Sequence, residues 1–216
     1  YRKGSMFSEI KGDFALIPVV FLLLYILINV FWGKLSEWNF LQQLNYKLEL
    51  DSHWVIGSFL NTTFYILYGV SATIVWSTIK GSRAKGLSFE TICLYVWSGF
   101  LLFVCISDII CGFNYESNAY VLGLRISIVI GDLSLIVFLV KQISESIKFK
   151  TPLIIAIVAM GLDVIRWGII FYMVYIQNQE TYSYKSLEVC DTIIRILFYG
   201  YNGIMVISFI LLFIVS

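Results

Sequence analysis

Seven charged residues lie inside otherwise apolar segments, and their side chains are the ones whose types could carry out chemistry. They are four aspartates and three arginines: Asp108, Arg125, Asp132, Asp163, Arg166, Asp191 and Arg195. Leaving an ionised side chain in the middle of a bilayer is unfavourable by a disputed amount, from about 2.5 to about 17 kcal/mol. We therefore expect these seven residues to avoid lipid, and we take them as the candidates for ligand or ion binding.

The spacing of some of these charges predicts ion pairs within single helices. Asp163 and Arg166 are three residues apart, so they share one face of a helix. Asp191 and Arg195 are four residues apart, which is the other spacing at which helical side chains meet. Two pairs within helices are therefore predicted.

One carboxylate should remain without a cation, because four aspartates stand against three arginines. Arg125 and Asp132 share a helix face at a spacing of seven residues. Asp132 and Asp163 are the deeper candidates for the unpaired position. A buried carboxyl group without a partner could take up a proton or bind a cationic solute.

The charged set allows two interpretations. Buried pairs of aspartate and arginine can simply lock helices into register. Alternatively, the charges can line a solvated vestibule that leads to a ligand or ion path. In that second interpretation Asp132, Asp163 and Arg166 form the site, and the other four charged residues line its outer approach.

The composition excludes a soluble protein. Of 216 residues, 59% are apolar and only 13% are charged, and the mean hydropathy is +0.85. The net charge of +1, without one large basic patch, argues against nucleic acid as a partner. Four cysteines without metal-ligand spacing and a single histidine, His53, offer no metal site, so we expect no metal or other cofactor.

Six apolar runs are each long enough to cross a hydrocarbon core of about 30 Å. They cover approximately residues 14–32, 54–79, 88–112, 119–141, 152–176 and 190–214. Helix is the only plausible state, because a lone strand in lipid cannot satisfy its own backbone. Thr151 and Pro152 are typical of an N-cap and a first helical residue. We predict an all-α, polytopic membrane protein, with about six transmembrane helices in one bundle and a single domain over residues 1–216.

The loop charges predict the orientation of these helices. The segments 80–85 and 141–150 are basic, whereas the segments 113–118 and 177–188 are not. By the positive-inside rule, both termini lie on the cytoplasmic side, or on the matrix side of a mitochondrial membrane. All seven charged residues then lie between the midplane and the outer face. The segment 33–52 is expected to contain a short amphipathic helix on the outer interface.

Small residues predict where helices approach one another closely. Ser127 and Gly131 form a small-xxx-small pair beside Asp132. Gly161 and Gly168 flank the charged turn of the fifth run, and we expect close contact there as well. The second run contributes a polar patch to the interior: Asn61, Thr62 and Thr63.

One stretch, Thr73 to Cys105, resembles a known carrier family. It contains a basic turn, then Lys85-Gly-Leu-Ser-Phe-Glu90, and then an apolar run that begins Thr-Ile-Cys-Leu-Tyr-Val-Trp. This stretch resembles the PQ-loop family, which includes cystinosin-like carriers, SWEET-type sugar carriers and the related KDEL receptor fold. The resemblance implies three-helix bundles that move small solutes by alternating access. The Pro-Gln pair that names the family is absent, so no binding residues are carried over.

No catalytic motif is visible: there is no HExxH, no G-x-S-x-G and no Walker loop, so we do not expect an enzyme. The first hypothesis is an integral membrane transporter or channel for a small solute, or one coupled to protons, with a charged cavity in its outer half. The second is a structural or assembly subunit of a larger membrane complex, and the third is a membrane receptor or sensor. The expected partners are the lipid bilayer, a small solute or proton, and other membrane subunits or further copies of the chain.

Overall fold

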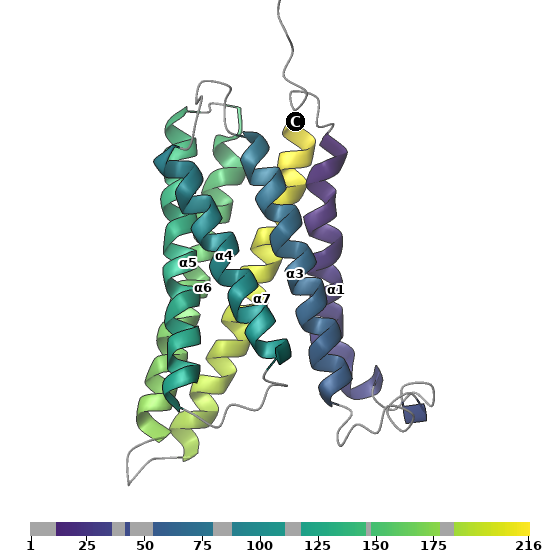
Figure 1. Cartoon of the computed structure of the whole chain (residues 1–216), viewed down its shortest axis with the longest axis vertical. Coiled ribbons are helices and arrows are strands. Elements are labelled where there is room, and N and C mark those ends of the chain that lie inside the picture. The colour runs from purple at the N-terminus through teal and green to yellow at the C-terminus, as the bar shows by residue number, and fades with distance from the viewer. Residues whose placement is uncertain are drawn as a thin grey trace, which may run out of the picture.

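The computed structural model describes residues 12–35, 42–43, 54–79, 88–110, 118–145, 148–177 and 184–216. Every regular element in these residues is helical, which confirms the predicted all-α fold class. A short 3-10 helix, η1 (Gly12–Ala15), precedes six long α-helices (Figure 1). Their bounds are α1 (Leu16–Leu35), α3 (Trp54–Ile79), α4 (Phe89–Ile110), α5 (Asn118–Glu145), α6 (Lys150–Gln177) and α7 (Tyr184–Val215).

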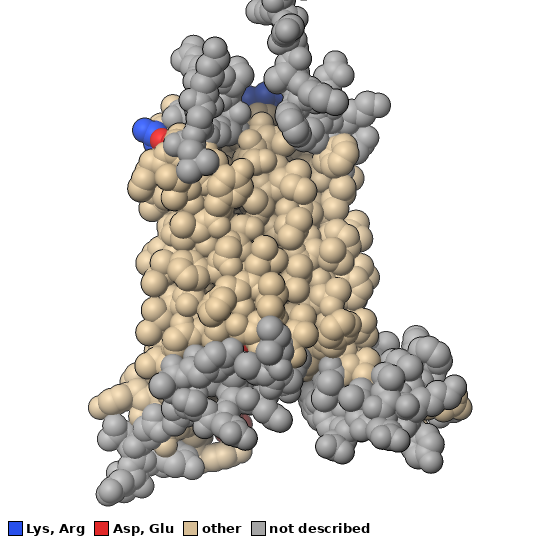
Figure 2. All heavy atoms as spheres, viewed as in Figure 1, with Lys and Arg blue, Asp and Glu red and all other residues tan. Residues whose placement is uncertain are grey.

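Within the described residues, five helices are long and apolar enough to cross a membrane, namely α3, α4, α5, α6 and α7. The first helix, α1, carries a shorter apolar segment, Leu16–Trp32. Figure 2 shows a broad band of uncharged surface between the two ends of the molecule. The chain is therefore an integral membrane protein.

Some helix boundaries differ from the predicted runs. The second predicted run, 54–79, coincides with α3. The predicted cap at Thr151 is wrong, because α6 already begins at Lys150 and Pro152 lies within its first turn. Pro152 has no backbone N–H, but at this position an N–H would have no acceptor within the helix, so its absence is harmless. The last helix, α7, begins at Tyr184 rather than at residue 190, because its polar first turns are helical without being apolar. Most of the segment 33–52, with its predicted surface helix, lies outside the described residues.

The six helices form a closed ring. Each packs against its neighbours along the chain, and α1 closes the ring by packing against α7. In Figure 1, α1 begins and α7 ends at the same end of the ring, which we name the C-terminal end; the opposite end is the far end. Lys148 Nζ donates a hydrogen bond to the carbonyl oxygen of Ser216 (3.2 Å), which brings the α5–α6 turn to the C-terminal end. That this end faces the cytoplasm or matrix stays a prediction.

The half of the ring toward the C-terminal end is filled with side chains; we call it the packed half. Its large apolar and aromatic side chains with almost no exposure are Leu22, Tyr68, Trp76, Leu94, Leu135, Phe138, Leu139, Leu153, Met160, Met205 and Phe209. Along the helices, each lies within about 17 Å of the C-terminal end, at about 1.5 Å per residue. The Phe209 ring lies 4.9 Å from that of Trp76, between centroids, and so joins α7 to α3 across the interior.

The glycines show which predicted close contacts form. A Cβ at Gly131 would lie 3.3 Å from Phe100 Cβ, so α5 approaches α4 closely there, as predicted. The predicted close contact at Gly161 and Gly168 is wrong, because a Cβ at either position would meet nothing within 4 Å. At 3.6 residues per turn, both glycines point about 140–160° away from Asp163, which faces the interior.

Candidate functional site

A cavity of about 370 Å³ lies among five helices, α1, α3, α4, α5 and α6. Its volume falls at the lower end of the range for ligand pockets, about 300–1,000 Å³. Most lining residues extend from near the middle of the helices toward the far end, although Trp97 lies only about 12 Å along α4 from the C-terminal end. The cavity therefore lies mainly beyond the packed half and overlaps it at α4. Asp108, Asp132 and Arg166 supply its charged lining.

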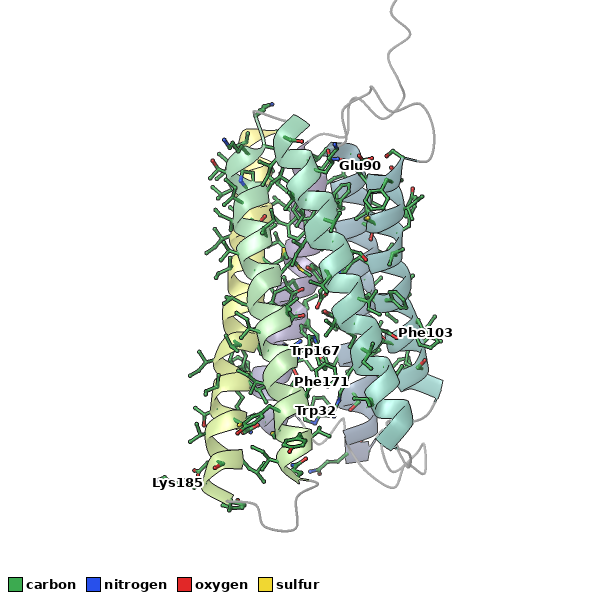
Figure 3. All side chains as sticks on the ribbon, turned by 90° about the vertical axis from the view of Figure 1, so that its left-hand side faces the viewer. Trp32, Glu90, Phe103, Trp167, Phe171 and Lys185 are labelled. Atoms are coloured by element: carbon green, nitrogen blue, oxygen red, sulfur yellow. The ribbon has the colours of Figure 1, made fainter. Side chains whose placement is uncertain are left out.

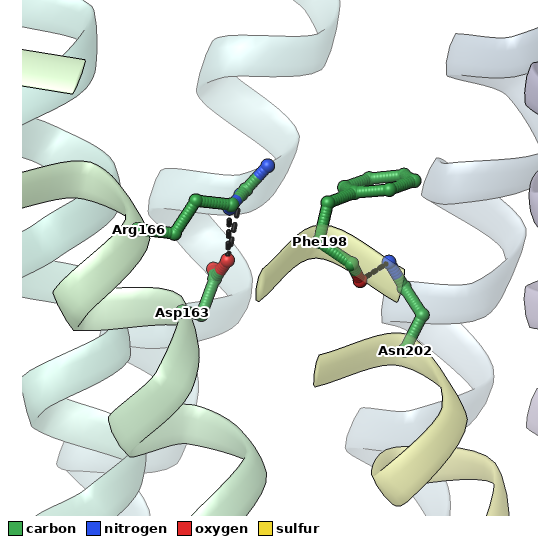
Figure 4. Close-up of polar contacts among 4 residues, drawn as sticks. All are labelled: Asp163, Arg166, Phe198 and Asn202. Atoms are coloured by element: carbon green, nitrogen blue, oxygen red, sulfur yellow. Dashed lines mark hydrogen bonds and ion pairs between the residues drawn. The ribbon is translucent and has the colours of Figure 1, made fainter. Parts of the chain in front are cut away.

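Asp163 and Arg166 form the predicted ion pair at the middle of α6 (Figure 4). Nε and Nη2 of Arg166 donate to Oδ1 of Asp163 at 2.7 and 2.6 Å. The side chain of Asp163 is 1% exposed and that of Arg166 is 14% exposed. The guanidinium carbon also lies 4.9 Å from the centre of the Trp167 ring. The positive charge of Arg166 is therefore matched by a partner on its own helix.

Asp132 is the buried carboxylate without a cation. It is 4% exposed, and its Oδ2 atom has no hydrogen-bond partner. It lies near enough to Asp163 and Arg166 to interact with both electrostatically. Those two already pair with each other, so Asp132 is left without a cation. The predicted count of one spare carboxylate is wrong among the described residues, because Asp108 has no ion-pair partner either.

Arg125 does not pair with Asp132, although the two share a face of α5. Arg125 is half-buried and has no ion-pair partner among the described residues. Seven residues along a helix span about 10.5 Å, which is too far for a direct contact between these side chains. Asp108 is also half-buried, near the end of α4, and likewise has no ion-pair partner in the described part of the chain.

Asp191 and Arg195 form the second predicted pair, at the far end of α7. Arg195 Nε lies 2.9 Å from Asp191 Oδ2, and the two side chains are 73% and 53% exposed. Neither residue lines the main cavity. Arg195 instead lines a smaller cavity of about 280 Å³, together with Arg166 and Asn29. The structure thus separates this pair from Asp108 and Asp132.

The walls of the main cavity contain aromatic residues that the charge pattern did not indicate: Tyr25, Tyr65, Trp97, Phe100 and Trp167. The rings of Tyr25 and Tyr65 lie 4.8 Å apart between centroids and join α1 to α3. Trp167 Nε1 is buried without a hydrogen-bond partner. Figure 3 shows Trp167, with Phe171 and Trp32, in the half toward the far end, which Lys185 marks. The only sequence feature that pointed to these wall residues is the abundance of aromatic residues within the apolar runs.

The polar patch predicted in the second run also reaches the cavity. Asn61 and Thr62 line it, together with Ser58 from the same helix. Asn29 Nδ2 donates a hydrogen bond to Asn61 Oδ1 at 2.8 Å. This bond between α1 and α3 holds the Asn61 side chain in place. The cavity therefore combines acceptors, hydroxyl groups and aromatic faces, which are the groups that hold small polar ligands.

No group of three or more His, Cys, Asp or Glu side chains in the described residues could hold a metal ion. The arrangement favours binding chemistry through hydrogen bonds, charge and aromatic contacts. A fold alone does not define a function, so the function has to be argued from this cavity. Comparison of the chain with models of known protein families, with curated proteins and with solved structures finds no match.

Proposed function

We propose that the protein is a membrane carrier for a small polar solute and that the cavity of about 370 Å³ is its binding site. The observation that supports this most strongly is Asp132, a buried carboxylate with an unpartnered oxygen in the cavity wall. An ionisable residue at membrane depth is unfavourable, and such residues mark solute and ion paths by default. A purely structural charge would be expected to have a partner.

One half of the ring is packed and the other contains the cavity, and this difference favours a carrier rather than an open channel. A carrier that works by alternating access holds its site open toward one side of the membrane while the other side is closed. The cavity lies mainly in the half toward the far end, and the packed half, with Trp76 and Phe209 in contact, closes the other. A solute could cross only if the helices moved to separate these rings.

The resemblance of residues 73–105 to the PQ-loop carriers supports the same proposal. In that stretch Ser88 precedes α4, and its hydroxyl group lies 3.0 Å from that of Thr91. Ser88 therefore lies at the start of the helix that supplies Trp97 and Asp108 to the cavity. The family would imply a small solute and alternating access.

A second candidate function is that of a structural subunit in a membrane complex. The first four turns of α7 favour it, because they expose an ion pair, Asp191–Arg195, among large apolar side chains. Tyr184 is 79% exposed and Ile196 is 65% exposed. A neighbouring subunit could cover this surface, which we call the α7 surface.

Solute and proton uptake into proteoliposomes that hold the purified full chain tests the carrier function. We expect uptake of at least one small polar solute by the wild-type protein, and its loss in the Asp132→Asn variant. Glu188→Gln is the matched control, because it removes one carboxylate from an exposed position outside the cavity. A pure protein that is inert to a broad solute panel, or that leaves the membrane only with other subunits, would contradict the carrier and favour the structural subunit.

A further inference from the structure

We infer that the cavity binds a small organic cation, such as a protonated or quaternary alkylamine. This inference rests on the proposed function as a solute carrier and names the chemical class of the solute. Three independent features of the cavity support it: its charge balance, the unpartnered oxygen of Asp132 and the aromatic walls. Each restricts the class of ligand in a different way.

Counted with every carboxyl group ionised, the charge balance of the cavity is negative. Among the described residues, Arg166 is the only basic residue in its lining, and Asp163 already matches that charge at 2.6 Å. Asp108 and Asp132 also line the cavity, and neither has an ion-pair partner among the described residues. A buried charge is tolerated best when a partner compensates it. A cationic solute would supply that compensation, an anion would be repelled, and a neutral solute would leave the balance unchanged.

The position of Asp132 gives the cation a definite contact. Asp132 is only 4% exposed, and its Oδ2 atom accepts no hydrogen bond from the described residues. In its ionised form a carboxylate can only accept hydrogen bonds, so the partner that Oδ2 lacks in that form is a donor. An ammonium N–H is such a donor, and hydrogen bonds between oppositely charged groups are the strong ones.

The aromatic walls favour a cation that also carries carbon. Aromatic faces attract cations within about 6 Å of the ring centre, and an alkylammonium ion gains apolar contact with them as well. The Arg166 guanidinium already lies 4.9 Å from the Trp167 ring centre, so that ring is partly used. Tyr25 and Tyr65 also use part of their surface in their mutual contact at 4.8 Å between centroids, and Trp97 adds a ring from a third helix. A bare metal ion would make no use of these walls.

The volume of the cavity limits the size of the cation. About 370 Å³ is near the minimum of the range for ligand pockets, roughly 300–1,000 Å³, so long-chain or polycyclic amines should be excluded. The same size class contains probes that differ in charge but little in shape: tert-butylammonium, tert-butanol and pivalate. Comparing these three separates the effect of charge from that of size.

Titration calorimetry on the purified full chain in detergent micelles, with these three probes, tests the inference. We expect tert-butylammonium to bind at least tenfold more tightly than tert-butanol or pivalate. Asp132→Asn should weaken the binding of the cation at least tenfold. Asp108→Asn should weaken the binding of the cation as well. Glu188→Gln, on the exposed part of α7, should leave it unchanged.

Two results would overturn the inference, and they differ in what they say of the carrier. If pivalate or tert-butanol binds as tightly as the cation, the cavity takes a solute of another class and the proposed carrier function stands. If no probe binds and the wild-type protein transports no solute in proteoliposomes, the carrier function fails as well. The wild-type comparison of the three probes does not depend on whether any variant folds.

Discussion

Replacing Arg166 by glutamine should destabilise the protein far more than the same change at Arg195. Asp163, the partner of Arg166, is 1% exposed, whereas Asp191, the partner of Arg195, is 53% exposed. Removing one partner of a buried ion pair typically lowers the free energy of unfolding by about 3–5 kcal/mol, because the other charge stays buried and uncompensated. An exposed pair contributes only about 0–1 kcal/mol. We therefore expect the two variants to differ by about 2 kcal/mol or more.

Equilibrium unfolding in mixed micelles, with increasing sodium dodecyl sulfate and circular dichroism as the signal, measures both changes on the same scale. The double variant Asp163→Asn/Arg166→Gln should recover most of the stability lost in Arg166→Gln. That recovery follows because the buried carboxylate then becomes a neutral amide. The double-mutant cycle gives the coupling free energy between the two side chains directly.

The reasoning fails if Arg166→Gln unfolds at the same detergent fraction as Arg195→Gln. Asp163 would then be solvated or otherwise compensated without its arginine, and the pair would not hold α6 in place. A double variant that is less stable than Arg166→Gln alone would also contradict it. In that case the loss would come from the contacts of the arginine with aromatic rings rather than from an uncompensated carboxylate.

Three smaller changes should be visible in the same unfolding assay. Gly57→Ala should lower the free energy of unfolding by about 1–3 kcal/mol, because the new Cβ would overlap the Trp32 indole. Gly161→Ala should raise it by up to about 1 kcal/mol, since the space is open and alanine favours helix; a loss would contradict the open space. Ser208→Ala should lower it by about 0.5–1.5 kcal/mol, because Ser208 Oγ donates to the Pro152 carbonyl at 2.8 Å in a buried position; no change would mean that this bond adds nothing.

Helices and local pairs could be predicted from the sequence because both depend on short-range geometry. An apolar run such as 54–79 must be helical in a bilayer, whatever surrounds it. The pair Asp163–Arg166 needs only the spacing of three residues on one helix, and the pair forms. The start of α7 was missed because hydropathy marks the part of a helix that lies in lipid, and not its polar extension.

The cavity could not be predicted from the sequence because it depends on how each helix is rotated in the ring. Hydropathy does not distinguish Gly131, which packs on α4, from Gly161, which meets open space. Nor does it show that Asp132 and Asp163, on adjacent helices, point to a common interior region. The separation of Arg195 from the main cavity has the same origin, since the far end of α7 lies outside the cavity wall.

The closed ring has a consequence for biogenesis. All walls of the main cavity come from helices that precede α7 in the chain, yet α7 is the helix that connects α6 to α1. Contacts between chain neighbours can form in order as the helices enter the membrane, and such local contacts form quickly. Closure of α1 on α7 joins helices that lie far apart along the chain and must come after those contacts. The binding site would therefore become fixed only at this late step, so ligand binding would report completed assembly.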